Sequence, residues 1–240
     1  MGVFHFKQFD VVNERSAMKV NTDGVLLGAV MDIRQDDRRL LDIGTGTGTI
    51  ALMAAQRLSG QQEIHIDAID IDRDSAEEAA VNFNDSPWPQ ILHSHHASLD
   101  EFSLSTSSEY DLIFSNPPYF EESLQAPEER RNAARHTATG LSFREIIDFA
   151  VRRLNPRGRL AFVLPSETET DLTRHARMSG LYLYKITRVR TVPRKSPKRI
   201  IAEFSRERCE SPEDCMLTIQ NEGQYTQEYL SLMKDFYLFA

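Results

Sequence analysis

Short β-rich apolar runs alternate with longer segments of helical periodicity from about residue 39 onward. The apolar runs predict four buried strands in the first half of the chain. They cover residues 40–43, 64–70, 91–97 and 110–115. Residues 49–58 and 74–84 carry apolar side chains at helical spacing and predict helices between these strands. This alternation is typical of a parallel sheet whose strands are joined by helical crossovers.

Capping boxes predict two helices in the second half of the chain. A capping box pairs a Ser or Thr at the helix start with a Glu or Gln three residues later, and each satisfies the other's backbone amide. Ser142 and Ser166 are both followed by Glu at this spacing, which predicts helices over 143–154 and from 166 toward 180. Three further apolar runs predict strands over 159–164, 181–192 and 200–205.

Residues 1–38 do not fit this alternation, and we interpret them as an N-terminal extension of a domain that spans 39–240. The stretch 207–214 is polar and contains a proline, which indicates a surface loop. The sequence therefore predicts an α/β fold with a mostly parallel sheet.

Charge and composition exclude several classes of protein. The chain has 240 residues, and 28 basic against 36 acidic side chains give a formal net charge of −8. A wholly basic nucleic-acid coat protein is excluded, so any nucleic-acid contact must come from a local basic patch. The two cysteines, Cys209 and Cys215, are too few for a disulfide-stapled scaffold. No apolar run approaches the roughly 20 residues of a membrane span, and we expect a soluble cytoplasmic monomer.

A glycine-rich loop, Asp42-Ile-Gly44-Thr-Gly46-Thr-Gly48, follows the first predicted strand. Glycine tolerates positive φ angles and lets a ligand approach the backbone, so this loop could cradle the phosphates of a dinucleotide. The dinucleotide fingerprint, however, requires its third glycine at the position of Thr49. The carboxylate of Asp42 would also repel a pyrophosphate, but it suits an ammonium group. The loop therefore favours S-adenosylmethionine, which carries an ammonium and a sulfonium, over NAD.

The second predicted strand ends in an acidic residue, Asp70. A carboxylate at this position can accept both hydroxyls of an adenosyl ribose. The structural alternative is that the glycines form only a tight turn and that Asp70 or Asp72 caps the next helix. Because the glycines, Asp42 and Asp70 occur together at the appropriate strand ends, we favour the adenosyl ligand.

The fourth predicted strand ends in the tetrapeptide Asn116-Pro117-Pro118-Tyr119. Proline cannot donate a backbone hydrogen bond, so the chain after the strand presents carbonyl groups. The Asn116 side-chain carbonyl and the Pro117 carbonyl could accept the two hydrogens of a planar amine. Tyr119 could stack on a planar target. The structural alternative is a rigid turn in which Asn116 is a cap and Tyr119 packs.

From about Leu40 to Pro165, the chain resembles class I S-adenosylmethionine-dependent methyltransferases, and the tetrapeptide resembles those that methylate planar amines. The flanking segments extend the resemblance to the family of tRNA1(Val) (adenine-37-N6)-methyltransferases. These segments are Phe6–Phe9, Met18–Gly28, Ser86–Trp88 and the tail from Tyr225 to Phe239.

This resemblance implies a Rossmann-like class I methyltransferase fold, with a mostly parallel seven-stranded sheet, an antiparallel last strand and helices on both faces. It implies N6 methylation of an adenine next to the anticodon, with Asn116, Pro117 and Tyr119 as catalytic residues. It also implies that the extension helps to close the cofactor pocket. The cofactor contacts that we expect are Thr22, Asp23, Asp42, Gly44, Gly46, Gly48, Asp70, Ile71, Ser98 and Asn116. Related enzymes often have Asp where this chain has Ser98, so a carboxylate contact is not expected from this residue.

Two basic clusters are candidates for RNA contact. The segment 185–199 carries no acidic residue, and 193–198 is expected to form a protruding loop. Lysine and arginine side chains in these clusters would position the phosphate backbone. The residues that we expect to contact RNA are Arg130, Arg131, Arg135, Arg188, Arg190, Arg194, Lys195, Lys198 and Arg199. The alternative for either cluster is a solvated surface.

Other activities remain open from the sequence. Asn-Pro-Pro-Tyr also fits glutamine-N5 methylation of release factors and DNA adenine-N6 methylation. A catalytically idle RNA-binding module is a further alternative, although Asp70 and Asn116 argue against it. His93, His95 and His96 lie close together on the third predicted strand, and we interpret them as packing and surface residues rather than ligands of a metal ion.

Overall fold

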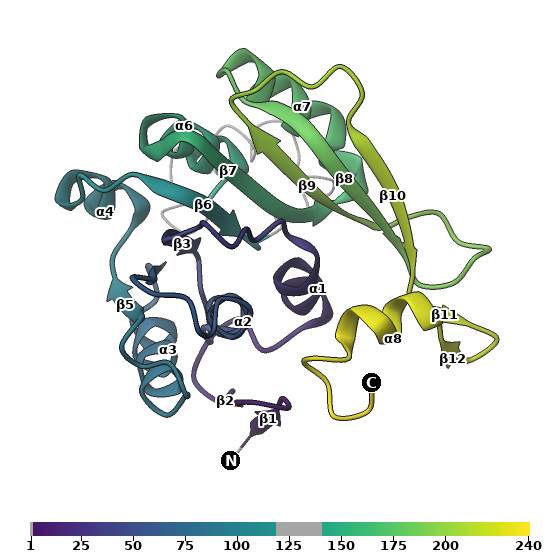
Figure 1. Ribbon diagram of the computed structural model, residues 1–240, viewed down its shortest axis with the longest axis horizontal. Coiled ribbons are helices and arrows are strands. Elements are labelled where there is room, and N and C mark those ends of the chain that lie inside the picture. Colours follow the sequence, from purple (N-terminus) through teal and green to yellow (C-terminus); the bar gives the residue numbers. More distant parts are fainter. Residues whose placement is uncertain (1, 119–140) are drawn as a thin grey trace, which may run out of the picture.

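The computed structural model describes residues 2–118 and 141–240, and an eight-stranded sheet runs through their centre (Figure 1). The strands of this sheet are β3 (Arg39–Ile43), β4 (His65–Asp70), β5 (Leu92–His96), β6 (Tyr110–Ser115), β7 (Leu154–Pro165), β8 (Tyr182–Arg190), β9 (Arg199–Ser205) and β10 (Glu213–Thr218). Their spatial order is β10-β8-β9-β7-β6-β3-β4-β5. Strands β3 to β7 are parallel to their neighbours in that group, whereas β9 is antiparallel to both β7 and β8.

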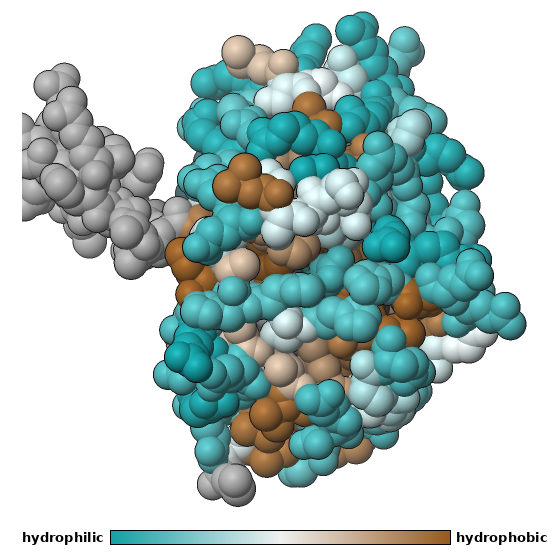
Figure 2. Space-filling view, turned by 90° about the vertical axis from the view of Figure 1, so that its left-hand side faces the viewer, coloured by the Kyte–Doolittle hydropathy of each residue, from teal (hydrophilic) through white to brown (hydrophobic). Residues whose placement is uncertain are grey.

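Helices cover both faces of the sheet. On one side are α1 (Thr22–Val30), α2 (Thr49–Arg57) and α3 (Arg73–Asn84); on the other are α4 (Leu99–Ser105), α6 (Phe143–Arg153) and α7 (Glu169–Met178). Alternate side chains of a strand point to opposite faces, so Leu40 packs in one core and Leu41 in the other. Hydrophilic residues prevail on the face drawn in Figure 2, with apolar residues between them.

The expected α/β class, with a mostly parallel sheet and an antiparallel strand near its end, is confirmed. The number of strands was wrong, because β10 adds an eighth strand parallel to β8. This strand begins inside the segment 207–214 that we expected to be a loop. Only its last two residues, Leu217 and Thr218, are buried, so β10 lacks the buried apolar run that marks a central strand such as β6.

The N-terminal extension packs into the same core as the sheet. It forms the hairpin β1 (Val3–His5) and β2 (Asp10–Val12), and then α1. Val25 to Leu27 of α1 are buried among α2 residues. The C-terminal segment contains the short strands β11 (Gln220–Asn221) and β12 (Gln224–Tyr225), then α8 (Gln227–Met233). Its Phe236 carbonyl accepts from the Lys7 amide at 2.8 Å, so the two ends of the chain lie together.

A short 3-10 turn, η2 (Ser166–Thr168), precedes α7 and completes the helical elements among the described residues. None of the helices in the described parts of the chain is long and apolar enough to cross a membrane.

Candidate active site

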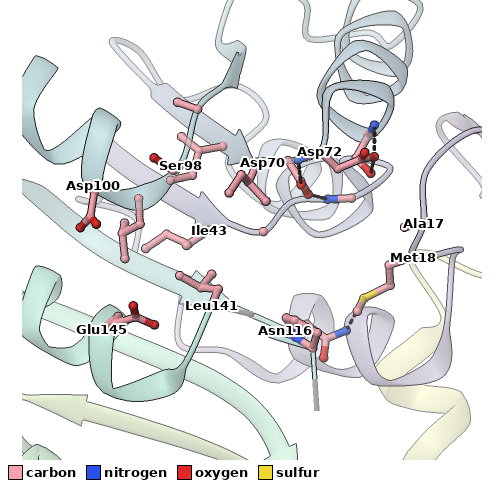
Figure 3. A pocket seen from close by; sticks show the side chains of 18 residues that line it. Ala17, Met18, Ile43, Asp70, Asp72, Ser98, Asp100, Asn116, Leu141 and Glu145 are labelled. Carbon is pink, nitrogen blue, oxygen red and sulfur yellow. Dashed lines mark hydrogen bonds between the residues drawn. The ribbon is translucent and has the colours of Figure 1, made fainter. Parts of the chain in front are cut away.

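A cavity of about 530 Å³ opens where β3, β4, β5 and β6 end (Figure 3). The carboxyl ends of parallel strands meet at one edge of a sheet, and the loops that follow them form a crevice there. Each of these strands contributes wall residues: Gly44 and Gly46 after β3, Asp70 to Asp72 at the end of β4, Ala97 to Asp100 after β5, and Asn116 with Pro118 after β6. The remaining wall includes Ala17 and Met18 of the extension and Leu141 and Glu145 near α6.

The glycine loop adopts a backbone that only glycine takes without strain. The φ angles of Gly44, Gly46 and Gly48 are 74°, 56° and 80°. Gly44 and Gly46 line the cavity, but Gly48 does not. A Cβ at Gly48 would come within 2.4 Å of the Phe83 ring on α3. Gly48 is therefore a site of close packing between the loop and α3, and its contact with the cofactor remains a prediction.

Asp70 lies on the cavity wall and is fixed by two backbone amides. Its Oδ2 accepts from the Gly46 amide and its Oδ1 from the Asp72 amide, both at 2.9 Å. Burial raises the pKa of Asp70, although these two donors oppose the shift. A carboxylate oxygen has more than one lone pair, so both oxygens can accept a further hydrogen bond from a ligand.

Asp42 is fully buried and does not form part of the cavity wall. Its Oδ2 accepts from the Thr45 hydroxyl at 2.7 Å, whereas Oδ1 has no hydrogen-bond partner among the described residues. Burial raises the pKa of Asp42 to about 7, the Thr45 hydroxyl opposes this shift, and the charge of Asp70 adds to it. The structure thus places Asp42 behind the glycine loop, where its charge would act through the loop rather than by direct exposure.

Asn116 is 4% exposed and stands at the end of β6, on the cavity wall. Its Nδ2 donates to the Met18 sulfur at 3.5 Å. The preceding Ser115 hydroxyl donates to the Ile43 carbonyl at 2.6 Å and ties β6 to β3. Pro117 is buried and Pro118 lines the cavity. Tyr119 lies outside the described residues, so its stacking role remains a prediction.

The region after β5 contains an acidic residue that the sequence reasoning missed. Ser98 lines the cavity, but it also caps α4: its hydroxyl donates to Glu101 Oε2 at 2.7 Å and accepts from the Glu101 amide. Asp100, in the first turn of α4, places a carboxylate in the cavity wall two residues later. Ser98 and Glu101 have the spacing of a capping box, which is the sequence signal that could have predicted α4. Ile71 also lines the cavity.

Thr22 and Asp23, which we expected to contact the cofactor, are not on the cavity wall. They are the first two residues of α1, whose cap is Asn21, and Asp23 accepts from Arg199 Nε at 2.7 Å. The extension instead reaches the cavity through Ala17 and Met18. Sequence spacing could not reveal this contact, because it depends on how the extension folds over the glycine loop.

Ion pairs reduce the predicted basic surface. Arg188 donates to Glu169 at 2.6 and 2.8 Å and to Asp214 at 2.9 Å. Arg199 pairs with Asp23, and Arg190 donates to the Thr218 hydroxyl. Both partners of such a pair lose much of their attraction for an external charge.

The loop that contains Arg194, Lys195 and Lys198 is different. All three side chains are exposed, and no acidic group within residues 2–118 or 141–240 forms an ion pair with them. Among the described residues of the predicted cluster, the exposed basic side chains without an acidic partner therefore lie in 193–198. The other expected RNA contacts, Arg130, Arg131 and Arg135, lie outside the described residues.

Comparison with known proteins shows which folds and families this chain resembles. The fold is similar to that of a predicted O-methyltransferase from Agrobacterium tumefaciens, with a TM-score of 0.65, 16% identity, and coverage of 89% of this chain and 96% of the other. It is also similar to a class I S-adenosylmethionine-dependent methyltransferase from Listeria monocytogenes, with a TM-score of 0.57, 14% identity, and coverage of 86% and 67%. The methyltransferase small domain family matches residues 15–180. The family match and the fold together define a class I methyltransferase.

Closer relatives narrow this class. The chain is 42% identical to the tRNA1(Val) (adenine(37)-N6)-methyltransferase of Flavobacterium psychrophilum, over 98% of this chain and 99% of the relative. It is 44% identical to the enzyme of the same name from Flavobacterium johnsoniae, with the same coverage. The protein belongs to the family of tRNA1(Val) (adenine(37)-N6)-methyltransferases. The resemblance drawn from the tetrapeptide and its flanking segments is confirmed.

Proposed function

We propose that this protein transfers a methyl group from S-adenosylmethionine to N6 of adenine 37 in tRNA1(Val). The main support is identity of 42% and 44% over 98% of the chain to relatives named for this reaction. The site adds chemical support, because one cavity contains both Asp70, suited to a ribose, and Asn116, suited to a planar amine. The comparisons do not favour the release-factor or DNA alternatives.

The cavity suits S-adenosylmethionine in size and in chemistry. Its volume of about 530 Å³ falls within the range of small-molecule sites. We assign the ribose hydroxyls to Asp70 and the adenine face to Ile71, a large apolar side chain that is 61% exposed. We assign the carboxylate of Asp100, which lines the cavity, to accept a hydrogen bond from the exocyclic amine of the cofactor's adenine. When bound, S-adenosylmethionine supplies a methyl group on a positively charged sulfur.

Asp42 contributes through its charge. The orphaned Oδ1 is buried behind the glycine loop, and a cation in the cavity would favour the ionised form of the carboxyl. The preference that the sequence indicated, for a cationic ligand over a pyrophosphate, thus has a structural basis in a buried carboxyl group.

Asn116 and Pro117 orient the target amine. The Asn116 side-chain oxygen and the Pro117 carbonyl accept the two amine hydrogens, which draws the nitrogen lone pair out of conjugation with the ring. A strong base is not required, because alignment and electrostatic stabilisation lower the barrier. Tyr119 is assigned to stack on the adenine.

The loop 193–198 is assigned to the tRNA backbone. An acidic protein needs such a local patch, and phosphate contacts fix the register of an RNA without selecting its sequence. An adenine in the anticodon loop is already unpaired, so its extrusion costs less than extrusion from a duplex. With tRNA as substrate we infer a cytoplasmic location, and a monomer remains our prediction.

The proposal is tested by incubating the protein with S-adenosylmethionine labelled on the methyl group. Four acceptors are compared: tRNA1(Val) transcript, the same transcript with guanine at position 37, duplex DNA and a peptide-release factor. We expect label only in the first transcript, with N6-methyladenosine detected by nucleoside mass spectrometry. Label in the release factor or the DNA, or no transfer to any acceptor, would overturn the proposal.

The same assay tests the assignment of Asn116. Asn116→Ala removes one acceptor for the amine and should lower turnover by about 100-fold or more. Cofactor affinity should stay within a few-fold of that of the unaltered protein. An equal loss of cofactor binding would show that Asn116 serves the cofactor rather than the target base.

A further inference from the structure

The segment from Val12 to Met18 is fastened to α3 before it reaches the cavity. The carboxylate of Glu78, which is 1% exposed, accepts from three consecutive backbone amides. Its Oε2 accepts from Glu14 and Arg15 at 2.9 and 2.7 Å, and its Oε1 accepts from Ser16 at 3.1 Å. One turn further along α3, the Asn82 side chain accepts from the Val12 amide and donates to the Val12 carbonyl. The path of the extension is therefore fixed up to Ser16.

Further contacts fix the position of the backbone from Ser16 to Met18. The Ser16 hydroxyl donates to the Met18 carbonyl at 3.1 Å and is hydrogen-bonded to the Ser75 hydroxyl at 3.0 Å. A Cβ at Gly46 would lie only 3.3 Å from the same carbonyl, so the extension touches the glycine loop here. The backbone of Met18 is thus held between α3 and the glycine loop.

From this position the Met18 side chain reaches Asn116 (Figure 3). The Met18 sulfur accepts from Asn116 Nδ2 at 3.5 Å, and both residues line the main cavity. They are 98 residues apart in sequence. The contact thus joins the extension to the residue that we assign to the target amine.

The hydrogen-bonding chemistry of the thioether and the amide determines which end of the Asn116 side chain faces the Met18 sulfur. An Asn side chain has a donor end and an acceptor end, and only its oxygen can accept the hydrogens of an amine. A thioether sulfur can accept a hydrogen bond but cannot donate one. When the amide turns its nitrogen to the sulfur, its oxygen faces the opposite way. The reversed amide would lose this bond and place its oxygen against the sulfur lone pairs.

We propose that Met18 is a positioning residue that selects the amide orientation of Asn116 in which Oδ1, rather than Nδ2, faces the target amine. This inference rests on the proposed function of Asn116. The resemblance implies that the N-terminal extension helps to close the cofactor pocket, and this proposal gives it a second role. The segment anchored by Glu78 positions the sulfur that orients the Asn116 amide.

Three variants test the proposal. Met18→Leu keeps the apolar volume of the side chain but removes the acceptor. Met18→Gln offers a carbonyl oxygen at a similar distance along the side chain and restores an acceptor. Met178→Leu is the matched control, because Met178 is 81% exposed at the end of α7. Turnover of the tRNA1(Val) transcript, cofactor affinity and thermal unfolding are measured for each variant.

Loss of one net hydrogen bond should lower kcat for Met18→Leu by about fivefold. We expect the melting temperature and the cofactor affinity of this variant to match those of the unaltered protein. Met18→Gln should recover most of the lost turnover, and Met178→Leu should leave turnover unchanged. If Met18 serves only to fill space, the order reverses, and Met18→Gln is less active than Met18→Leu. That order, or full activity of Met18→Leu, overturns the proposal.

A readout that does not depend on substrate separates this proposal from the proposed function. The side-chain amide of Asn116, assigned through Asn116→Ala, gives a pair of proton–nitrogen NMR signals. We expect these signals to shift in Met18→Leu and to keep their positions in Met178→Leu. If the unaltered protein fails to methylate tRNA, the proposed function fails, but the amide signals still test the contact. If the protein is active and the signals do not respond to Met18→Leu, the positioning role fails alone.

Discussion

The Gly46 amide donates to Asp70 Oδ2 over 2.9 Å, so the loop after β3 is tied to the last residue of β4. The other oxygen of Asp70 accepts from the Asp72 amide, at the turn into α3. One carboxylate thus shapes the two backbone segments that enclose the cavity on this side. Asp70 can therefore hold the two backbone segments in place and also bind a ribose. The Gly46 and Asp72 amides fix the orientation in which the carboxylate would meet the ligand.

Asp70→Asn should weaken cofactor binding by about tenfold or more, because hydrogen bonds to a charged group contribute more than neutral ones. The amide retains the shape of the side chain, but it has only one acceptor oxygen for two backbone donors and a ribose. Isothermal titration with S-adenosylhomocysteine measures the effect. Asp74→Asn, at an exposed carboxylate on the first turn of α3, is the control. Equal affinities for the two variants would contradict the ribose assignment.

The sequence predicted the central strands well because a buried strand requires a run of apolar residues, which is a local mark in the sequence. For β6, the predicted range 110–115 matches the observed Tyr110–Ser115. Among the described residues, the sequence pattern did not predict α1 or α4, and both lack such a mark. An apolar stripe would stand out in α1 only if one side faced water, but the five residues from Gly24 to Gly28 are all buried. In α4, Phe102 is the single buried residue of a short helix.

The same difference separates the cavity residues that the sequence could predict from those that it could not. Asp70, Asn116 and the first two loop glycines reach the cavity because each lies at the carboxyl end of a buried strand or within three residues after it. Met18 and Leu141 reach it through the path of segments that no local pattern fixes. Nor could composition show that Arg188 is paired, since Glu169 lies 19 residues away on α7.

Glu78→Gln should release the extension from α3. Glutamine replaces one of two acceptor oxygens with a donor that faces backbone amides, at a cost of about 1–3 kcal/mol for each buried group left unsatisfied. We expect a lower free energy of unfolding in urea and weaker cofactor binding, because Ala17 and Met18 form part of the cavity wall. The neighbouring Glu77→Gln is the control, since Glu77 is exposed and pairs with the side chains of Arg73 and Arg15. Similar losses in both variants would argue against a specific anchor at Glu78.

Charge reversal of the loop 193–198 should weaken tRNA binding in a salt-dependent way. Replacing Arg194, Lys195 and Lys198 with glutamate removes up to three phosphate contacts, so the slope of log affinity against log salt should fall by about 2. Filter binding between 50 and 300 mM salt, roughly the range in which such slopes are resolved, measures this change. Arg157→Glu is the control, because Arg157 is exposed near the start of β7, at the opposite end of the parallel strands from the cavity. An unchanged slope for the triple variant would remove the loop from the interface.

The buried Asp42 should make the protein less stable as pH rises from about 4 to about 7. Burial raises the pKa of Asp42 to about 7, whereas the same group in an unfolded chain ionises near 3.8. Between these values the folded protein keeps a proton that the unfolded chain has lost, so unfolding is favoured as pH rises and the effect levels off above pH 7. The full span corresponds to about 4 kcal/mol.

Asp42→Asn has no proton to lose, so we compare urea unfolding of both proteins between these pH limits. The free energy of unfolding of the unaltered protein should fall relative to the variant across this window. Parallel curves would show that Asp42 is ionised in the folded protein throughout, and that a partner compensates its charge.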